Sequence, residues 1–207
     1  TNFIDVLQTL CYTINRQKAR RNLINIESRK YKEHNMKILS KQKNSRMCMI
    51  CGLDNEYGVN APFYNMEDGS VMTVFRYKEQ HQSYPGRVHG GMITAMLDEM
   101  GLRSLWAKEL SEETFGVTIS LDTKYRKPVP YETELIGRGV VVKNTSHFII
   151  TDSYIMDKDG EILANGRIKY IKMDTQKIQE GVEVHEEMPY LVEDGRTEIE
   201  GPFFDNL

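Results

Sequence analysis

Apolar residues recur at helical spacing near the beginning of the chain, which predicts a helix there. The stripe consists of Ile4, Leu7, Cys11 and Ile14. A second helix, more polar and with a narrow apolar face, is predicted from about Asn22 to Leu39. Residues 41–45 are expected to form a linker.

The pattern changes at Met47, where the body of the protein is expected to begin. Two strands are predicted at 57–66 and 70–77, and Asp68-Gly69 supplies the turn between them. Four further strands, joined by short turns, are predicted near 114–123, 132–143, 146–156 and 161–172.

Between these two groups of strands lies a segment, Gly90 to about Lys108, that is apolar nearly all round. A helix of this kind is buried. The order predicts an α+β domain in which one antiparallel sheet of five or six strands wraps around a long central helix. We expect a basic helical extension over 1–46, this domain over 47–173 and an acidic tail over 174–207.

Charge is divided unevenly along the chain. Residues 1–46 hold eleven basic and three acidic residues, whereas residues 174–207 hold two basic and ten acidic ones. A basic head could contact nucleic acid or an anionic membrane. These basic residues are not accompanied by a motif that recognises nucleic-acid sequence. The favoured interpretation is therefore that they are solvated or pack near the acidic tail.

Three cysteines in 207 residues argue against a disulfide scaffold and favour the cytoplasm. The chain shows no secretory peptide and no apolar stretch long enough to span a bilayer. Cys48 and Cys51 form a Cys-x-x-Cys, but a structural zinc ion usually needs four ligands. Only Cys11, His34 and His81 remain, at unconvincing spacing. We therefore expect no metal and no cofactor, and two small buried residues at Cys48 and Cys51.

Candidate chemistry is found where the apolar helix begins, at His89-Gly90-Gly91. The first N–H groups of a helix have no partner within it and lie at the positive end of its dipole. Glycines leave them unshielded, so a carbonyl oxygen that gains negative charge would be stabilised there. The alternative is that the glycines only allow the loop to turn into the helix, and these residues alone leave both open.

Asp98 and Glu99 are unexpected in an apolar helix, because charged groups are rarely buried without a partner or a task. One of them could instead face a polar edge near Arg103 and Lys108. Asp98 lies eight residues beyond Gly90, which is roughly 12 Å along a helix axis. A base must lie within hydrogen-bond reach of its target or of one intervening water. If both groups serve one substrate, two subunits must supply them, which predicts at least a dimer with interfacial sites.

The run from His81 to Glu99, HQSYPGRVHGGMITAMLDE, closely resembles the PaaI-like hotdog thioesterases. Also similar are Cys48-Met49-Ile50-Cys51-Gly52 before the first strand and Tyr125-Arg126-Lys127-Pro128 after the strand that follows the helix. The resemblance covers about Cys48 to Met173. It implies the hotdog fold and hydrolysis of acyl-CoA to free acid and CoA by a dimer or a dimer of dimers, without a membrane or nucleic-acid partner.

The resemblance also implies roles for individual residues. The N–H of Gly90, after His89 and with possible help from Gly91, would polarise the thioester carbonyl. Asp98 would activate water or attack the carbonyl itself, and Thr118 would position the water. Some members carry an Asn six residues before the histidine, where this chain has Ser83, so a positioning role there is in doubt.

Phosphates of CoA are expected to meet basic residues at the entrance, and flexible Met side chains would suit a tolerant acyl pocket. The residues expected to contact substrate are Ser83, Arg87, Val88, Met92, Glu99, Val117, Arg126 and Lys127. Ordinary surface or core roles remain open for each of them. Two other functions also remain open: a non-catalytic acyl-CoA sensor whose basic head contacts DNA, and a hotdog enoyl-CoA hydratase.

Overall fold

The computed structural model describes residues 31–33, 35–109, 115–173 and 187–204. The chain divides into two compact units. In the first, the strands β1 (Tyr31–Glu33) and β12 (Pro202–Phe204) pair antiparallel. The second unit, His34–Gly201, contains every other described element. The helix predicted over the first residues lies outside the described part of the chain.

The second unit is built around one long helix, α2 (Gly90–Glu109), with a short 3₁₀ helix, η1 (Glu79–His81), before it. Its strands are β2 (Met36–Lys41), β3 (Tyr64–Met66), β4 (Val71–Phe75), β5 (Gln82–Tyr84), β6 (Arg87–Val88), β7 (Phe115–Tyr125), β8 (Leu135–Asn144), β9 (Phe148–Met156), β10 (Ile162–Met173) and β11 (Glu198–Ile199). The helix and the strands β7 to β10 confirm the elements predicted for these segments.

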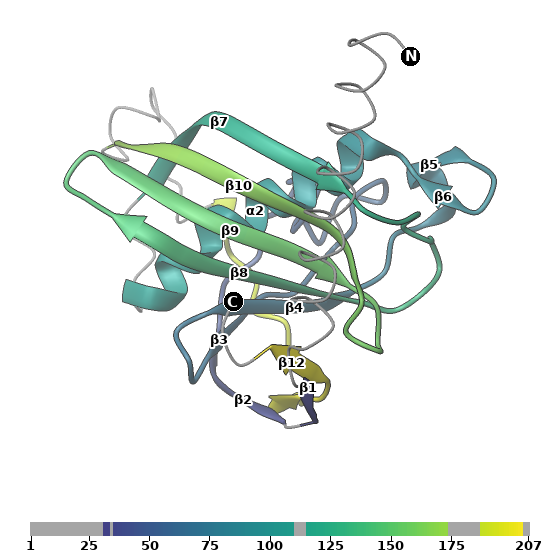
Figure 1. Ribbon diagram of the computed structural model, residues 1–207, viewed down its shortest axis with the longest axis horizontal. Helices are drawn as coiled ribbons and strands as arrows, with labels where there is room; N and C mark the ends of the chain where they lie inside the picture. Colours follow the sequence, from purple (N-terminus) through teal and green to yellow (C-terminus); the bar gives the residue numbers. More distant parts are fainter. Residues whose placement is uncertain (1–30, 34, 110–114, 174–186, 205–207) are drawn as a thin grey trace, which may run out of the picture. The chain divides into compact units, whose positions relative to one another are not determined.

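Eight of the described strands form one antiparallel sheet in the order β11-β2-β3-β4-β8-β9-β10-β7, and α2 lies across it (Figure 1). The strands β5 and β6 form a separate hairpin immediately before the helix. One sheet wrapped around one central helix is the hotdog arrangement, so the predicted fold is confirmed. The sheet is wider than the five or six strands expected, because β2 and β11 extend it.

The prediction of helix from about Asn22 to Leu39 is wrong for residues 31–33, which lie in β1, and for residues 36–39, which lie in β2. Met36 is buried and Ile38 half-buried, while Lys37 and Leu39 point to solvent. The strand pairs with β3 on one side and with β11 on the other. Pairing with segments distant in sequence outweighs local helical spacing, which is a weak guide.

The strand predicted at 57–66 is also shorter than expected, since only β3 forms there. Asn60 adopts a left-handed backbone with φ 58°, which interrupts an extended run. The unit also extends beyond 47–173 at both ends. Asn44 pairs with Tyr190, and Ile199 is 1% exposed.

The helix packs very closely on the sheet. Met96, Leu97 and Met100 are fully buried in the main apolar core. A Cβ added to Gly139 on β8 would lie only 2.5 Å from the carbonyl oxygen of Met100. Gly101 on the helix leaves equally little room beneath Tyr170 and Thr151. Glycines on both surfaces therefore bring the helix axis close to the sheet, a use of glycine where backbones nearly touch.

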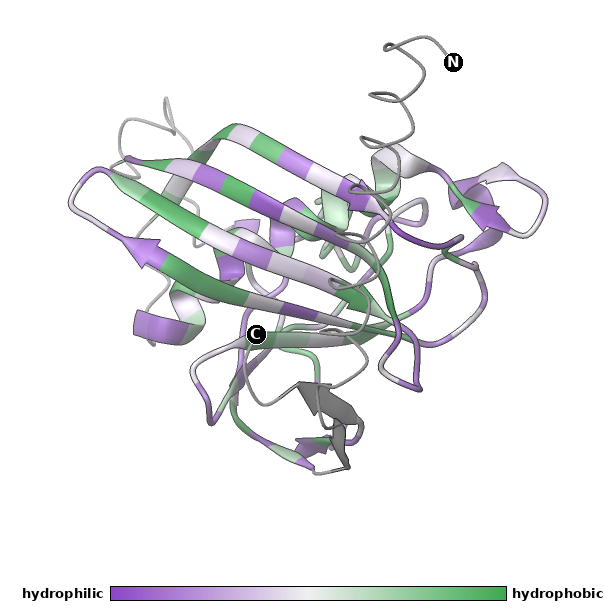
Figure 2. Ribbon diagram, viewed as in Figure 1, coloured by the Kyte–Doolittle hydropathy of each residue, from purple (hydrophilic) through white to green (hydrophobic). Residues whose placement is uncertain are grey.

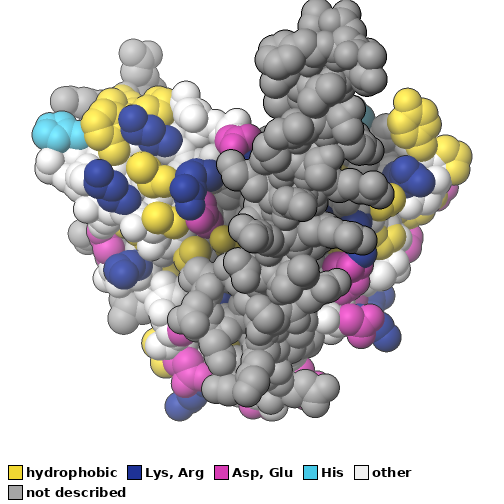
Figure 3. Space-filling model, in the orientation of Figure 1, with side chains coloured by type: hydrophobic (Ala, Val, Ile, Leu, Met, Phe, Trp, Pro, Cys, Tyr) yellow, Lys and Arg dark blue, Asp and Glu magenta, His cyan; other side chains and the backbone are white. Residues whose placement is uncertain are grey.

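The strands alternate between apolar and polar side chains, as the pattern of green and purple along them shows (Figure 2). On β10, Ala164, Ile168 and Tyr170 are buried and Arg167 is exposed. Apolar and basic side chains stand side by side on the outer face of the sheet (Figure 3). An example is Lys169, whose Nζ lies 4.3 Å from the centre of the Phe148 ring.

Among the described residues, no helix has both the length and the apolar character that crossing a membrane requires.

Candidate active site

The beginning of α2 presents one backbone donor rather than two. The N–H of Gly91 donates to Nδ1 of His89 over 2.9 Å, so this N–H is already engaged. The N–H of Gly90 has no hydrogen-bond partner among the residues that the structure describes. His89 is itself held by a backbone bond of 2.8 Å to the carbonyl of His81. The helix dipole and this single N–H leave one place for a developing oxyanion.

His81 holds the loop that leads into this helix. Its side chain is 4% exposed, its Nε2 lies 2.7 Å from the carbonyl of Tyr57, and its Nδ1 accepts from the N–H of Lys78. With one ring nitrogen accepting, the other carries the proton and donates to the carbonyl. Both ring nitrogens are therefore used to hold the loop that precedes the helix.

Tyr125, at the end of β7, lies against the same helix start. Its hydroxyl donates to the carbonyl of Gly90 over 3.1 Å and lies 2.6 Å from Oγ1 of Thr94. A Cβ on Gly90 would come within 3.3 Å of that hydroxyl oxygen. The tyrosine thus fixes the first turn of the helix against the edge strand.

Asp98 lies two turns further along α2 and is half-buried. The hydroxyl of Thr118 on β7 reaches both carboxylate oxygens, at 2.9 and 3.2 Å. The hydroxyl of Tyr170 donates to the backbone carbonyl of Asp98 over 2.7 Å. Burial raises the pKa of Asp98, and the hydrogen bond from Thr118 acts in the opposite direction. The result is a fixed carboxylate on the side of the helix that faces the sheet edge.

Asp98 and the N–H of Gly90 do not meet within one chain. The helix runs without interruption from Gly90 to Glu109, so the eight-position step from Gly90 to Asp98 spans roughly 12 Å. The side of the helix that carries Asp98 faces β7, which ends the sheet. Val117 and Ile119 on this strand are 40% and 50% exposed, so the edge strand presents apolar surface.

Glu99 points to a different side of the helix from Asp98. Its Oε1 accepts from Nε of Arg103 over 2.7 Å, and Arg103 is 1% exposed. The guanidinium also bonds to Gln42 and to the carbonyl of Lys43. The structure therefore places Glu99 in a buried ion pair beside Cys48, apart from Thr118 and the sheet edge.

Four other residues expected to contact substrate lie in a hollow beside the helix start and on the hairpin before it. Met92 lines a hollow of about 330 Å³ together with His89, Met49 and Tyr57. Ser83 and Arg87 are exposed on the hairpin formed by β5 and β6, while Val88 is buried there.

The two basic residues after β7 are exposed and engaged in surface pairs. Nε of Arg126 donates to Asn165 over 2.6 Å, and Lys127 pairs with Glu161. Exposed contacts of this kind contribute little free energy, so both basic side chains remain available to bind an anion. Sequence reasoning missed the hydroxyls of Tyr125 and Tyr170, because neither carries a recognisable spacing to the helix.

One antiparallel sheet around a buried helix defines a hotdog domain. Residues 85–164 match the thioesterase superfamily model.

The chain is also similar to two acyl-coenzyme A thioesterases, and a solved structure shares its fold. The chain is 26% identical over 153 residues to acyl-coenzyme A thioesterase THEM4 of Rattus norvegicus, covering 73% of this chain and 62% of the relative. It is 23% identical over 100 residues to acyl-coenzyme A thioesterase 13 of Homo sapiens, covering 48% and 70%. A crystal structure of a thioesterase superfamily protein shares the fold, with TM-score 0.55, 21% identity and coverage of 78% and 81%. The chain spans less than two thirds of the rat relative.

Proposed function

We propose that this protein hydrolyses acyl-CoA thioesters to the free acid and CoA. The observation that carries the proposal is the carboxylate of Asp98, half-buried in an apolar helix and held by the hydroxyl of Thr118. The superfamily match over residues 85–164 supports a thioester as the bond that is cleaved.

Asp98 acts as the general base in this proposal. It removes a proton from a water molecule while the water oxygen attacks the thioester carbonyl carbon. The carbonyl oxygen becomes an oxyanion and accepts a hydrogen bond from the N–H of Gly90. Collapse of the tetrahedral intermediate breaks the carbon–sulfur bond, and the proton held by Asp98 passes to the leaving CoA thiolate. Base and oxyanion donor contribute about 10²–10⁴-fold and about 10²–10³-fold to such reactions.

The two groups come from different subunits. Within one chain they are separated by roughly 12 Å, which no single water bridges. β7 offers an eleven-residue edge that no described strand covers, and Asp98 lies behind it. Pairing of two such edges about a two-fold axis brings the helix start of one chain toward Asp98 of the other, twice per dimer.

Substrate contacts follow from this placement. The hollow beside His89 and Met92 lies next to the oxyanion donor and suits part of the acyl or pantetheine chain. Arg87, Arg126 and Lys127 are exposed, and we assign them to the CoA phosphates, for which basic side chains are the natural partners.

The test is a panel of acyl-CoA substrates with detection of the released thiol, run on the native chain and on Asp98→Asn. The amide keeps the shape and the hydrogen bond from Thr118 but cannot accept the proton, so kcat should fall about 10²–10⁴-fold with little change in KM. An enoyl-CoA arm distinguishes hydrolysis from hydration. Normal turnover by Asp98→Asn, or hydration without thiol release, would refute the assignment.

Sharing of the site between subunits has its own test. Gly90→Pro deletes the N–H of the first helical residue, a position that tolerates proline. Asp98→Asn and Gly90→Pro should each be nearly inactive, and unfolding and refolding them together should restore about a quarter of native activity. Half of the dimers are then mixed, and each mixed dimer has one intact site. Absence of recovery in refolded mixed dimers would show that each chain works alone.

A further inference from the structure

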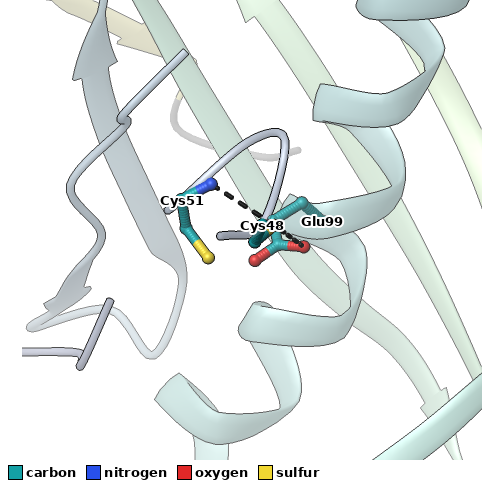
Figure 4. A group of neighbouring side chains, drawn as sticks. All are labelled: Cys48, Cys51 and Glu99. Atoms are coloured by element: carbon teal, nitrogen blue, oxygen red, sulfur yellow. Dashed lines mark hydrogen bonds between the residues drawn. The ribbon is translucent and has the colours of Figure 1, made fainter. Parts of the chain in front are cut away.

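Two cysteines and a glutamate gather between a loop and the central helix, outside the residues used for hydrolysis. The thiols of Cys48 and Cys51 and the carboxylate of Glu99 offer ligand atoms that all lie within 4.8 Å of one another (Figure 4). Oε2 of Glu99 lies 3.9 Å from Sγ of Cys48. Sulfur and oxygen ligands of one tetrahedral ion stand about 3.5–3.8 Å apart when metal–ligand distances are about 2.0–2.3 Å. The cluster therefore needs little movement to close on an ion.

Backbone donors of the loop hold the first sulfur in place. The N–H groups of Ile50 and Cys51 point at Sγ of Cys48 over 3.3 and 3.4 Å. These two contacts fix the sulfur on the side of the loop that faces Glu99.

The loop is also tightly closed. The N–H of Gly52 donates to the carbonyl of Cys48 over 2.9 Å. A Cβ at Gly52 would lie 2.5 Å from that oxygen and from the nitrogen of Cys48, so only glycine fits. The side chain of Asn44 binds the carbonyl of Cys51 over 2.6 Å. The two sulfurs are thus held in place by the backbone before any ion binds.

Charge gives a further reason for a cation. Oε1 of Glu99 is occupied by Arg103, which leaves Oε2 turned toward the sulfurs. Carboxylates that bind metals are commonly held by a second hydrogen bond in this way. Once an ion has displaced both thiol protons, the two thiolates, Glu99 and Arg103 sum to two negative charges. A divalent cation neutralises that sum.

We propose that Cys48, Cys51 and Glu99 bind a zinc ion. Thiolates select soft or borderline metals, and three protein ligands leave one of the four zinc positions for water or a further group. Binding displaces one proton from each thiol, so two protons are released for each ion bound. The proposal does not depend on the thioesterase activity.

Bound zinc would join the loop to the helix beside the proposed base. Glu99 directly follows Asp98, and Met49, between the two cysteines, lines the hollow next to His89 and Met92. The ion would therefore fix one wall of the hollow relative to α2. The ion takes no part in the proton transfer assigned to Asp98, because Asp98 points to another side of the helix.

The experiment measures zinc in the full chain, purified with reductant and stripped with chelator, by titration with ZnCl₂ against a chromophoric competitor. We expect one equivalent, and a melting temperature several degrees higher with zinc than with chelator. Cys48→Ser and Cys51→Ser should weaken binding about 100-fold or more, and Glu99→Gln about 10–100-fold. Cobalt(II) in place of zinc should show thiolate charge-transfer absorption that either serine variant diminishes.

Asp98→Asn is the matched control, since it makes the same acid-to-amide change one residue away. It should keep the full equivalent of zinc whether or not it hydrolyses acyl-CoA, so the two proposals fail separately. Circular dichroism of each variant excludes loss of fold. Absence of stoichiometric zinc in the reduced native chain, or unchanged affinity in both serine variants, would overturn the site. A Cys48–Cys51 disulfide without zinc binding after reduction would replace it by a redox pair.

Discussion

Thr118 is the point at which the sheet touches the carboxylate of Asp98. Its hydroxyl lies within hydrogen-bond distance of both oxygens, and its side chain is exposed. Thr118→Val keeps the shape and removes the donor, so the carboxylate loses its orientation and kcat should fall about 10-fold. Stability should change by less than about 0.5 kcal/mol, as at other exposed positions.

Thr118→Ser is the matched control for this change, because it retains the hydroxyl and should keep most of the activity. Both variants are compared by steady-state kinetics and thermal melts. Equal loss in the valine and serine variants would mean that the methyl group, and not the hydrogen bond, supports Asp98.

A second residue-scale prediction concerns the buried guanidinium of Arg138. It is 7% exposed, and Asp68 accepts its hydrogen bond over 2.6 Å. Asp68→Asn leaves this charge without its counter-ion and should cost about 2–4 kcal/mol of unfolding free energy at pH 7.

The pH dependence of this pair has a definite sign. Burial alone would raise the pKa of Asp68, but bonds from Ser70 and the charge of Arg138 outweigh it, and the pKa is lowered in the fold. The stabilisation is thus present above the unfolded pKa of about 3.9 and is lost as the pH falls through the folded pKa. Urea unfolding at a series of pH values checks this: the difference between native and variant should shrink below about pH 4. A constant difference would contradict it.

At the scale of residues, the sequence allowed the charged positions in the helix to be singled out but not their partners. Asp98 stands out because it interrupts an apolar pattern. Its contact with Thr118 depends on the register between α2 and β7, which spacing does not encode. Glu99 lies 51 residues from Cys48, so the cluster of thiols and carboxylate could not be read from Cys-x-x-Cys spacing.

At the scale of elements, the close packing of α2 on β8 gives the next prediction. A Cβ at Gly139 would meet the backbone of Met100, which cannot move aside as a flexible side chain could. Gly139→Ala should therefore lower the unfolding free energy by about 2–3 kcal/mol.

Gly166→Ala on β10 is the matched control for the glycine variant. There a Cβ would have its nearest neighbours at 3.5 Å, an ordinary contact. This variant should be near neutral in the same chemical denaturation experiment. Equal stability of the two variants would show that the helix is free to shift away from the sheet.

Elements with long, regular patterns of apolar and polar residues were the ones that the sequence predicted well. The helix and the strands β7 to β10 were predicted close to their bounds, because each is long and either buried or regularly alternating. β2 and β11 were not, because each is short and depends on a partner distant in the chain. Tertiary pairing decided their structure.

At the scale of the whole molecule, the proposed dimer forms through the edge of β7, which none of the described strands covers. Ile119 is 50% exposed on it. Ile119→Asp places like charges near each other across the two-fold axis and should yield monomers with little residual turnover.

Ile171→Asp is the matched control for the edge variant, on β10 and 37% exposed. It should retain the dimer and its activity. Light scattering after gel filtration reports the assembly, and thiol release reports the turnover. A fully active monomer of Ile119→Asp would refute sharing of the site.

The outline of the whole unit was only partly predictable. The oligomer inferred from the length of one helix stays a prediction. Nothing in the sequence indicated that residues 187–201 pack beside Lys41, Asn44 and Tyr64. These contacts join segments more than 120 residues apart, and no periodic pattern of apolar residues in the sequence indicates them.

The glycine-lined approach of α2 to the sheet limits where a long substrate can go. With Gly139 against Met100 and Gly101 beneath Tyr170, no tunnel for a fatty chain fits under the middle of the helix. In the proposed thioesterase, an acyl tail would instead extend along the flank of the helix. We therefore expect chain-length preference to be set by side chains at the mouth of the site and to change through surface substitutions that leave the packing beneath the helix untouched.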